Sequence, residues 1–180
     1  MKIVIDACVL YPTVMREVVL GVARAGAFTP LWSPRLLEEW ARAAAKLGPE
    51  GEAQARAEIV GLRAAWPHAE LQVPEGFADR FWLPDPADIH VLAAAVYGSA
   101  DAIMTLNAKD FPRNLLAEEG LSRVDPDSYL LGVWQASADL VTPVAEDVLA
   151  TARRLSGQDW DMRALLKKAR LPRLGKAMTR

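Results

Sequence analysis

The sequence is poor in the residues that form disulfides and zinc sites. It has one cysteine, Cys8, and two histidines, His68 and His90. A single cysteine cannot form a disulfide within the chain, so a cytoplasmic setting fits best. With so few sulfur and imidazole ligands, we expect neither a zinc finger nor a zinc hydrolase of the usual kind. Metal chemistry in this chain would have to rely on oxygen ligands.

Long apolar runs are also missing. No stretch reaches the ~18 apolar residues that a membrane-spanning helix needs. Lys2 and Asp6 place charges of both signs near the N-terminus, unlike a secretory signal. Hydrophobic residues make up 52% of the 180 residues and charged residues 24%, as in ordinary globular proteins. We therefore expect one folded domain, with or without an appendage, and no association with a membrane.

The charges are distributed unevenly along the chain. The formal net charge is −2 at pH 7, but residues 1–150 carry −9 and residues 151–180 carry +7. An acidic body favours carboxylates gathered at a cation site, and a basic tail favours an anionic partner. The tail could equally dock on the acidic body, and the sequence leaves both alternatives open.

Segments typical of strands and helices alternate along most of the chain. Residues 3–5 form a β-branched run that is typical of a strand buried on both faces of a parallel sheet. Ser33-Pro34 and Asp85-Pro86 are helix starts, because a capping side chain precedes a proline. The patterns predict strands at 3–5, 28–32, 102–106 and 121–124, and helices at 13–25, 34–47, 50–66, 86–97, 115–119 and 126–134.

This alternation predicts an α/β fold with a central parallel sheet and helices on both sides. We expect residues 1–136 to form this body. Beyond it the chain changes character, since Thr142-Pro143 begins an amphipathic helix and Gly157 ends it. We expect residues 137–180 to form a C-terminal helical extension.

Acidic and amide side chains are expected at one edge of the sheet. Asp6 directly follows the first strand, and Asn107 and Asp110 follow the third. Right-handed crossovers bring the loops after parallel strands to the same edge, where ligands bind in open α/β sheets. Helices that begin near this edge contribute further acids. The polar residues expected there are Asp6, Glu39, Asp85, Asp88, Asn107 and Asp110.

Crowded carboxylates indicate a bound cation. Like charges brought together raise the free energy of the fold unless a positive charge sits between them. Oxygen ligands select hard divalent cations such as Mg²⁺ or Mn²⁺. A site of this kind can lower the pKa of a bound water and stabilise the charge on a phosphodiester. The pattern therefore favours a metal-dependent nuclease or phosphatase.

Most of these acids also have a simpler explanation. Asp85 and Asp88 suit the first turn of a helix, where the helix dipole favours negative charge. Glu39 could be an exposed helix residue, and Asp110 could cap a turn. Asp6 has no comparable structural role, because a carboxylate at the end of a buried strand contributes nothing to packing.

At four segments the sequence resembles the PIN-domain ribonucleases, especially the bacterial VapC-type toxins. The segments occur in the family's order and spacing, and the resemblance extends over roughly residues 1–130. They are Ile3-Val4-Ile5-Asp6-Ala7-Cys8, residues 33–40 (SPRLLEEW), residues 85–95 (DPADIHVLAAA) and residues 103–112 (IMTLNAKDFP). The resemblance implies a three-layer α/β/α fold, an acidic site for Mg²⁺ or Mn²⁺, and endonucleolytic cleavage of RNA.

The resemblance also implies roles for individual residues. Asp6 would be the first metal ligand, with Glu39 as the second acid and Asp88 as the third. Asp85 would be a supporting acid, and Thr105 would orient the site through its hydroxyl group. The implied catalytic residues are Asp6, Glu39, Asp88 and Asp110, of which Asp6, Asp88 and Asp110 would bind the metal.

Asn107 departs from the family's pattern. Many members carry aspartate two residues after the threonine, and Asn107 occupies that position here. Its side chain can form hydrogen bonds but brings no charge. Asp110 follows three residues later, in an Asn-x-x-Asp-Phe ending that part of the family shares. This departure leaves open whether the site holds one metal ion or two.

By the same resemblance, we expect RNA as substrate, a homodimer and a cognate antitoxin protein. A different class of function stays open, in which the chain is a catalytically degenerate PIN-like module that binds protein or RNA. Two other enzyme classes fit less well. A haloacid dehalogenase-type phosphatase needs an aspartate where Cys8 stands, and a receiver domain needs an acidic pair near the end of the first strand. Cys8 is expected to be a small buried side chain, and His90 a neutral histidine that either packs or faces solvent.

Overall fold

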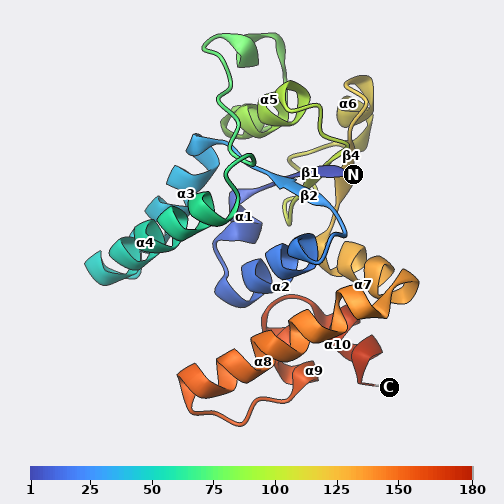
Figure 1. Cartoon of the computed structure of the whole chain (residues 1–180). Coiled ribbons are helices and arrows are strands. Elements are labelled where there is room, and N and C mark those ends of the chain that lie inside the picture. Colours follow the sequence, from blue (N-terminus) through green and yellow to red (C-terminus); the bar gives the residue numbers. More distant parts are fainter. Residues whose placement is uncertain (180) are drawn as a thin grey trace. The chain divides into compact units, whose positions relative to one another are not determined.

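The computed structural model describes residues 1–179, and Figure 1 shows its helices and strands. None of the described helices is long and apolar enough to cross a membrane. The elements of the first half are β1 (Lys2–Ile5), α1 (Ala7–Leu10), α2 (Thr13–Arg24), β2 (Thr29–Leu31), α3 (Pro34–Ala45), α4 (Pro49–Ala65), η1 (Phe77–Arg80) and η2 (Pro86–Asp88). The remaining elements are α5 (Ile89–Tyr97), β3 (Ala102–Met104), α6 (Arg113–Glu118), β4 (Ser122–Val124), α7 (Pro126–Ala136), η3 (Ala138–Leu140), α8 (Thr142–Ser156), α9 (Met162–Lys168) and α10 (Pro172–Met178).

The four strands form one parallel sheet in the order β2-β1-β3-β4. β1 lies in the interior and pairs in parallel with β2 and with β3. Ile3, Val4 and Ile5 are fully buried, as expected for β-branched residues of a central strand. The predicted α/β fold with a parallel sheet and a C-terminal helical region is therefore confirmed.

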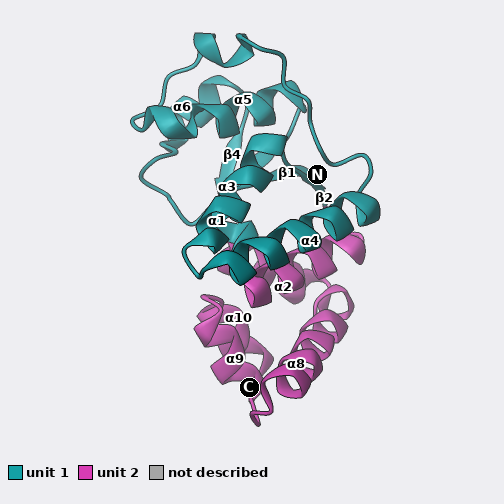
Figure 2. Ribbon diagram, turned by 90° about the vertical axis from the view of Figure 1, so that its left-hand side faces the viewer, with its two compact units in different colours: residues 1–11, 29–123 teal, residues 12–28, 124–180 magenta. Residues whose placement is uncertain are grey.

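The chain divides into two compact units, coloured separately in Figure 2. Unit 1 comprises residues 1–11 and 29–123, and unit 2 comprises residues 12–28 and the chain from residue 124 onward. Unit 2 therefore combines α2 and α7 with the C-terminal helices α8, α9 and α10. The predicted boundary between residues 136 and 137 separates domains that would fold independently. The division into compact units does not test this, so the boundary stays a prediction.

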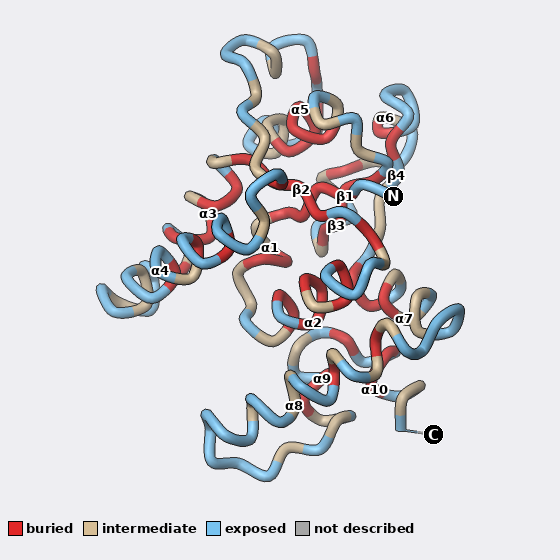
Figure 3. Tube along the Cα trace, viewed as in Figure 1, coloured by how far each residue is buried: buried red, intermediate tan, exposed pale blue. Residues whose placement is uncertain are grey.

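In unit 1, α3 and α5 show how the sequence pattern becomes packing. Figure 3 shows the buried stretches of the chain in red. α5 packs on β1 and β3, and its residues 91–95 (VLAAA) are buried. α3 buries Leu36, Leu37 and Trp40, but it ends at Ala45. The predicted helix over residues 34–47 is therefore shorter at its C-terminal end, and Leu47 is 73% exposed beyond it.

Unit 2 contains a buried acid with a structural role. Asp127 lies in the first turn of α7 and is 5% exposed. Its two carboxylate oxygens accept hydrogen bonds from the backbone N–H groups of Arg173 (2.9 Å) and Leu174 (3.0 Å). These N–H groups begin α10 and have no partner within that helix. Asp127 thus caps α10 from a distant part of the chain.

Asp127→Ala is expected to lower the free energy of unfolding by about 2 kcal/mol, because it leaves the two N–H groups without an acceptor. Urea denaturation at pH 7 would measure the change. Asp125→Ala is a matched control, since Asp125 accepts only the exposed Ser128 N–H at 2.9 Å. The control should cost about 1 kcal/mol or less. An equal loss in both variants would contradict a special role for Asp127.

Candidate active site

Asp6 lies where β1 ends and α1 begins. Its backbone N–H donates to the Met104 carbonyl at 3.0 Å and so continues the pairing of β1 with β3. Its backbone carbonyl accepts the N–H groups of Val9 and Leu10 in the first turn of α1. The side chain takes no part in capping this helix, although the residue is 4% exposed. The backbone therefore fixes the residue and leaves its carboxylate available for another task.

Thr105 holds the Asp6 carboxylate from the next strand. Its hydroxyl group donates to Asp6 Oδ2 at 2.6 Å and accepts the Asn107 N–H at 3.0 Å. Thr105 is 2% exposed, so the hydroxyl proton has few other acceptors. The positioning role that the resemblance implied for Thr105 matches this geometry. Asn107 contributes its backbone N–H, while the residue as a whole is exposed.

Cys8 is the second residue that touches the Asp6 carboxylate. Its thiol donates to the same Oδ2 atom at 3.1 Å and accepts the Leu106 N–H at 3.3 Å. Burial and the neighbouring Asp6 carboxylate raise the pKa of the Cys8 thiol to about 12, so it stays protonated and can donate. We had expected a packing residue. The sequence does show one feature that points to this contact: Cys8 is two residues after Asp6, in the first turn of a helix, where its side chain can reach the Asp6 carboxylate.

Asp88 lies close to three other carboxylates. Burial, together with the charges of Asp6, Asp85 and Asp110, raises the pKa of the Asp88 carboxyl group to about 6. The nearby His90 has the opposite, weaker effect. Asp88 forms no capping hydrogen bond with its own side chain. Asp88 does lie in the first turn of η2, where the helix dipole favours its charge, and the neighbouring acids oppose that charge.

Asp85 is a helix cap, as the Asp-Pro pattern predicted. Its Oδ1 atom accepts the Ala87 N–H at 2.9 Å at the start of η2. Asp110 is half-buried in the loop after β3, where its N–H donates to the Asn107 carbonyl at 3.1 Å. Both acids still contribute negative charge at Asp88.

Glu39 is directed elsewhere. Its Oε1 atom lies 2.7 Å from His90 Nε2 and 3.6 Å from Arg35 Nε. It is not among the charges that shift the pKa of Asp88. The His90 ring nitrogens are buried and form no hydrogen bond of good geometry within residues 1–179, so the contact with Glu39 is one of proximity.

Glu38, the neighbour of Glu39, belongs to the surface. It forms ion pairs with Arg42 at 3.1 Å and with Arg56 at 3.0 Å, and hydrogen bonds from Arg56 and Arg42 lower its pKa. Glu39, in contrast, lies next to His90 of α5.

These residues match a divalent cation in donor type and in charge. The carboxylates of Asp6, Asp88 and Asp110 offer the oxygen atoms that Mg²⁺ and Mn²⁺ prefer. Burial and then the charges of Asp6, Asp85 and Asp110 raise the pKa of Asp88, and the nearby His90 offsets only part of this effect. As they stand, no three His, Cys, Asp or Glu side chains of the described chain lie close enough to bind one ion together. An ion held by one or two of these carboxylates would complete its coordination with water and substrate oxygens.

Comparison with known families gave one match. The PIN domain matches residues 2–109, three fifths of the chain. The matched stretch contains Asp6, Glu39, Asp88 and Asn107, and it ends one residue before Asp110. No curated protein and no solved structure matched the chain significantly.

Proposed function

The chain belongs to the PIN-domain family, and on this basis we propose that it is a metal-dependent endoribonuclease. PIN domains are generally metal-dependent nucleases, which supports the general class. The observation that carries the proposal is the group of acids around Asp88, where burial and the charges of Asp6, Asp85 and Asp110 raise the pKa of the Asp88 carboxyl group to about 6. Carboxylates are seldom gathered in this way unless a cation is to be bound.

Asp6, Asp88 and Asp110 are the residues that would hold the cation. Bound Mg²⁺ or Mn²⁺ would supply positive charge for the phosphate and lower the pKa of water at the site. Thr105 and Cys8 both donate to Asp6 Oδ2, which leaves Oδ1 as the oxygen for the cation. This arrangement resembles the partners that orient metal ligands in other proteins.

Glu39 and Asn107 would act beside this group. Glu39 would be the remaining catalytic acid, with His90 and Arg35 setting the position of its carboxylate. Asn107 can form hydrogen bonds but adds no charge, which supports a site built for one tightly held ion. Arg35 has a side chain that is 61% exposed and could also contact a phosphate of the substrate.

Single-stranded RNA or RNA loops are the proposed substrate. Protein side chains cannot read the deep major groove of an RNA duplex, whereas unstacked bases and their phosphates are accessible. By the resemblance to VapC-type toxins, we further propose that the chain is the cytoplasmic toxin of a toxin–antitoxin pair. It would then form a homodimer and be neutralised by a cognate antitoxin protein.

Removing divalent ions tests this proposal. Cleavage of a fluorescently labelled single-stranded RNA should fall to background in EDTA and return when Mn²⁺ or Mg²⁺ is added in excess. A duplex of the same sequence should be cut at least about tenfold more slowly. Unchanged cleavage in EDTA would contradict a metal-dependent mechanism.

The second candidate function is a degenerate PIN-like module that binds protein or RNA without cleaving it. Asn107 favours this alternative, as does the absence of a close three-ligand group within residues 1–179. Calorimetric titration with Mn²⁺ separates the two functions. A nuclease should bind Mn²⁺ at the acidic group, and Asp6→Asn should abolish that binding. A degenerate module should give no heat that depends on Asp6.

A further inference from the structure

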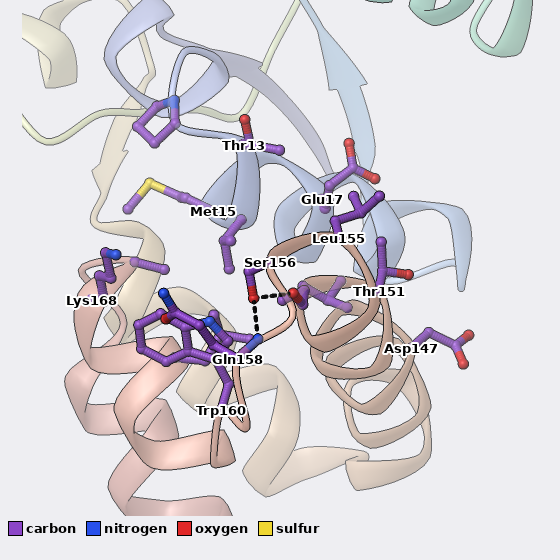
Figure 4. Close-up of a pocket in the computed structure, with 16 residues that line it drawn as sticks. Thr13, Met15, Glu17, Asp147, Thr151, Leu155, Ser156, Gln158, Trp160 and Lys168 are labelled. Carbon is purple, nitrogen blue, oxygen red and sulfur yellow. Dashed lines mark hydrogen bonds between the residues drawn. The ribbon is translucent and has the colours of Figure 1, made fainter.

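Unit 2 contains a largely apolar groove that no part of the proposed nuclease mechanism uses. The groove has a volume of about 630 Å³. It is lined by the N-terminal part of α2, by α8 from Asp147 onward, and by α9 with the loop before it. Figure 4 shows that Asp147, Thr151 and Leu155 lie along one side of α8, while Trp160 and Lys168 lie across from them. Lys168 Nζ lies 4.8 Å from the centre of the Trp160 ring, so these two side chains contact each other on this side of the groove.

The groove exists because α8 is covered only at its beginning. α2 and α8 pack so closely at Gly21 that a Cβ atom there would collide with Val144. Ala145 is the one buried residue of α8. Further along the helix, Val148 and Ala152 are half-buried and Leu155 is 72% exposed. An apolar stripe on a helix is normally covered by another element, and here the second half of the stripe lacks one.

α8 carries one acidic and one basic residue placed so that each would lie opposite the other in a second, antiparallel copy of the helix. Asp147 and Arg154 are seven residues apart, about two turns, and therefore lie on the same flank of the helix. That flank borders the row of Val148, Thr151 and Leu155. Neither Asp147 nor Arg154 forms an ion pair within the described chain. The helix dipole accounts for the order of their signs, but not for their shared flank beside the apolar row.

From this pattern we infer that α8 is the contact surface of a two-fold symmetric dimer, in which the α8 helices of two copies pack antiparallel. In an antiparallel pair the same flank of each helix faces its counterpart. Asp147 then lies opposite the partner's Arg154, and Arg154 opposite the partner's Asp147. Leu155 of each copy enters the other groove beside the partner's Val148. A two-fold axis makes such a contact self-complementary and closed.

This inference specifies the surface of the homodimer proposed above, but it does not depend on nuclease activity. An active monomer would overturn it and leave the proposed nuclease activity intact. An inactive dimer would support the inference and contradict the proposed nuclease activity. Measuring the oligomeric state therefore tests the dimer surface, and the cleavage assay independently tests the nuclease activity.

Sedimentation equilibrium on the full chain tests the apolar part of the contact. The wild type should be dimeric, and Leu155→Glu should weaken dimerisation at least about 30-fold, because it places a carboxylate in the apolar groove. Val60→Glu is the matched control, since Val60 in α4 is 66% exposed and lies in unit 1. It should leave the dimer unchanged. A wild type that is monomeric at all concentrations, or a Leu155→Glu variant that dimerises normally, would overturn the inference.

A charge exchange tests the antiparallel arrangement. Asp147→Arg alone and Arg154→Asp alone should each weaken the dimer about tenfold, since each places like charges opposite one another twice. The double variant should recover dimerisation, even though its reversed charges oppose the helix dipole and lower the melting temperature. Helix destabilisation alone predicts the weakest dimer for the double variant. A failure to recover would therefore sink the antiparallel pairing.

Discussion

Asp6→Asn is expected to lower cleavage of single-stranded RNA in Mn²⁺ by about a thousandfold. The substitution keeps the size of the side chain, and the amide oxygen can still accept the hydrogen bonds of Thr105 and Cys8. The negative charge is removed, and an amide NH₂ group replaces Oδ1, the oxygen proposed for the cation. A metal ion contributes several kcal/mol of charge stabilisation to such a reaction, and about 4 kcal/mol corresponds to this factor.

The assay compares initial rates on a labelled RNA at saturating Mn²⁺. Asp79→Asn serves as a control, because Asp79 is an exposed acid of η1 in the same unit. It removes one negative charge from the unit without touching the acidic group, and its rate should match the wild type. Equal cleavage by Asp6→Asn and the wild type would remove the metal-nuclease mechanism.

Asp88→Asn is expected to have opposite effects on stability and activity. Cleavage should fall about a hundredfold, because a proposed metal ligand loses its charge. Without divalent ions at pH 7, the free energy of unfolding should rise by about 1–2 kcal/mol. The full pKa shift, from 3.8 to about 6, corresponds to about 3 kcal/mol, and solvent screening of this half-buried group reduces it.

The sign of the stability effect follows from proton binding. The folded state holds the Asp88 proton up to about pH 6, and the unfolded state releases it near pH 3.8. Between these values the folded state binds more protons, so rising pH lowers the free energy of unfolding of the wild type. Above pH 6 the destabilisation is complete, and below about pH 3.8 it vanishes.

Urea denaturation from pH 4 to pH 7 would measure this dependence. Asp88→Asn should flatten the curve, and its advantage should disappear towards pH 4. Asp79→Asn is the control, because it removes an exposed charge that is not among those raising the pKa of Asp88, and it should leave the pH dependence unchanged. Adding Mg²⁺ should stabilise the wild type more than Asp88→Asn. A variant less stable than the wild type at pH 7 would show that Asp88 is held by favourable contacts.

Local patterns predicted the elements that depend on neighbouring residues. The run Ile3-Val4-Ile5 became the buried central strand, and Ser33-Pro34 begins α3 with a hydrogen bond from the Leu36 N–H to Ser33 Oγ. The pattern from Thr142 to Gly157 became α8 and its left-handed cap. These features rest on propensity, capping and periodicity, which act over a few residues and can be seen in one sequence.

The partners of the acidic residues required the tertiary structure. Thr105 and Asp6 are 99 positions apart, and no local pattern shows that a hydroxyl group donates to that carboxylate. The contact of Glu39 with His90 likewise depends on how α3 and α5 are placed and on the directions of two side chains. The grouping of α2 with the C-terminal helices is another result of packing across the chain.

The sequence by itself thus determined that a carboxylate ends the central strand and that further acids share its edge of the sheet. Only the tertiary structure decided which acids influence one another. It placed Asp88 within the field of Asp6, Asp85 and Asp110, and it turned Glu39 towards His90 and Arg35. The physical reason is that charge interactions depend on distances of a few ångströms, and side chains far apart in sequence reach those distances only through the fold.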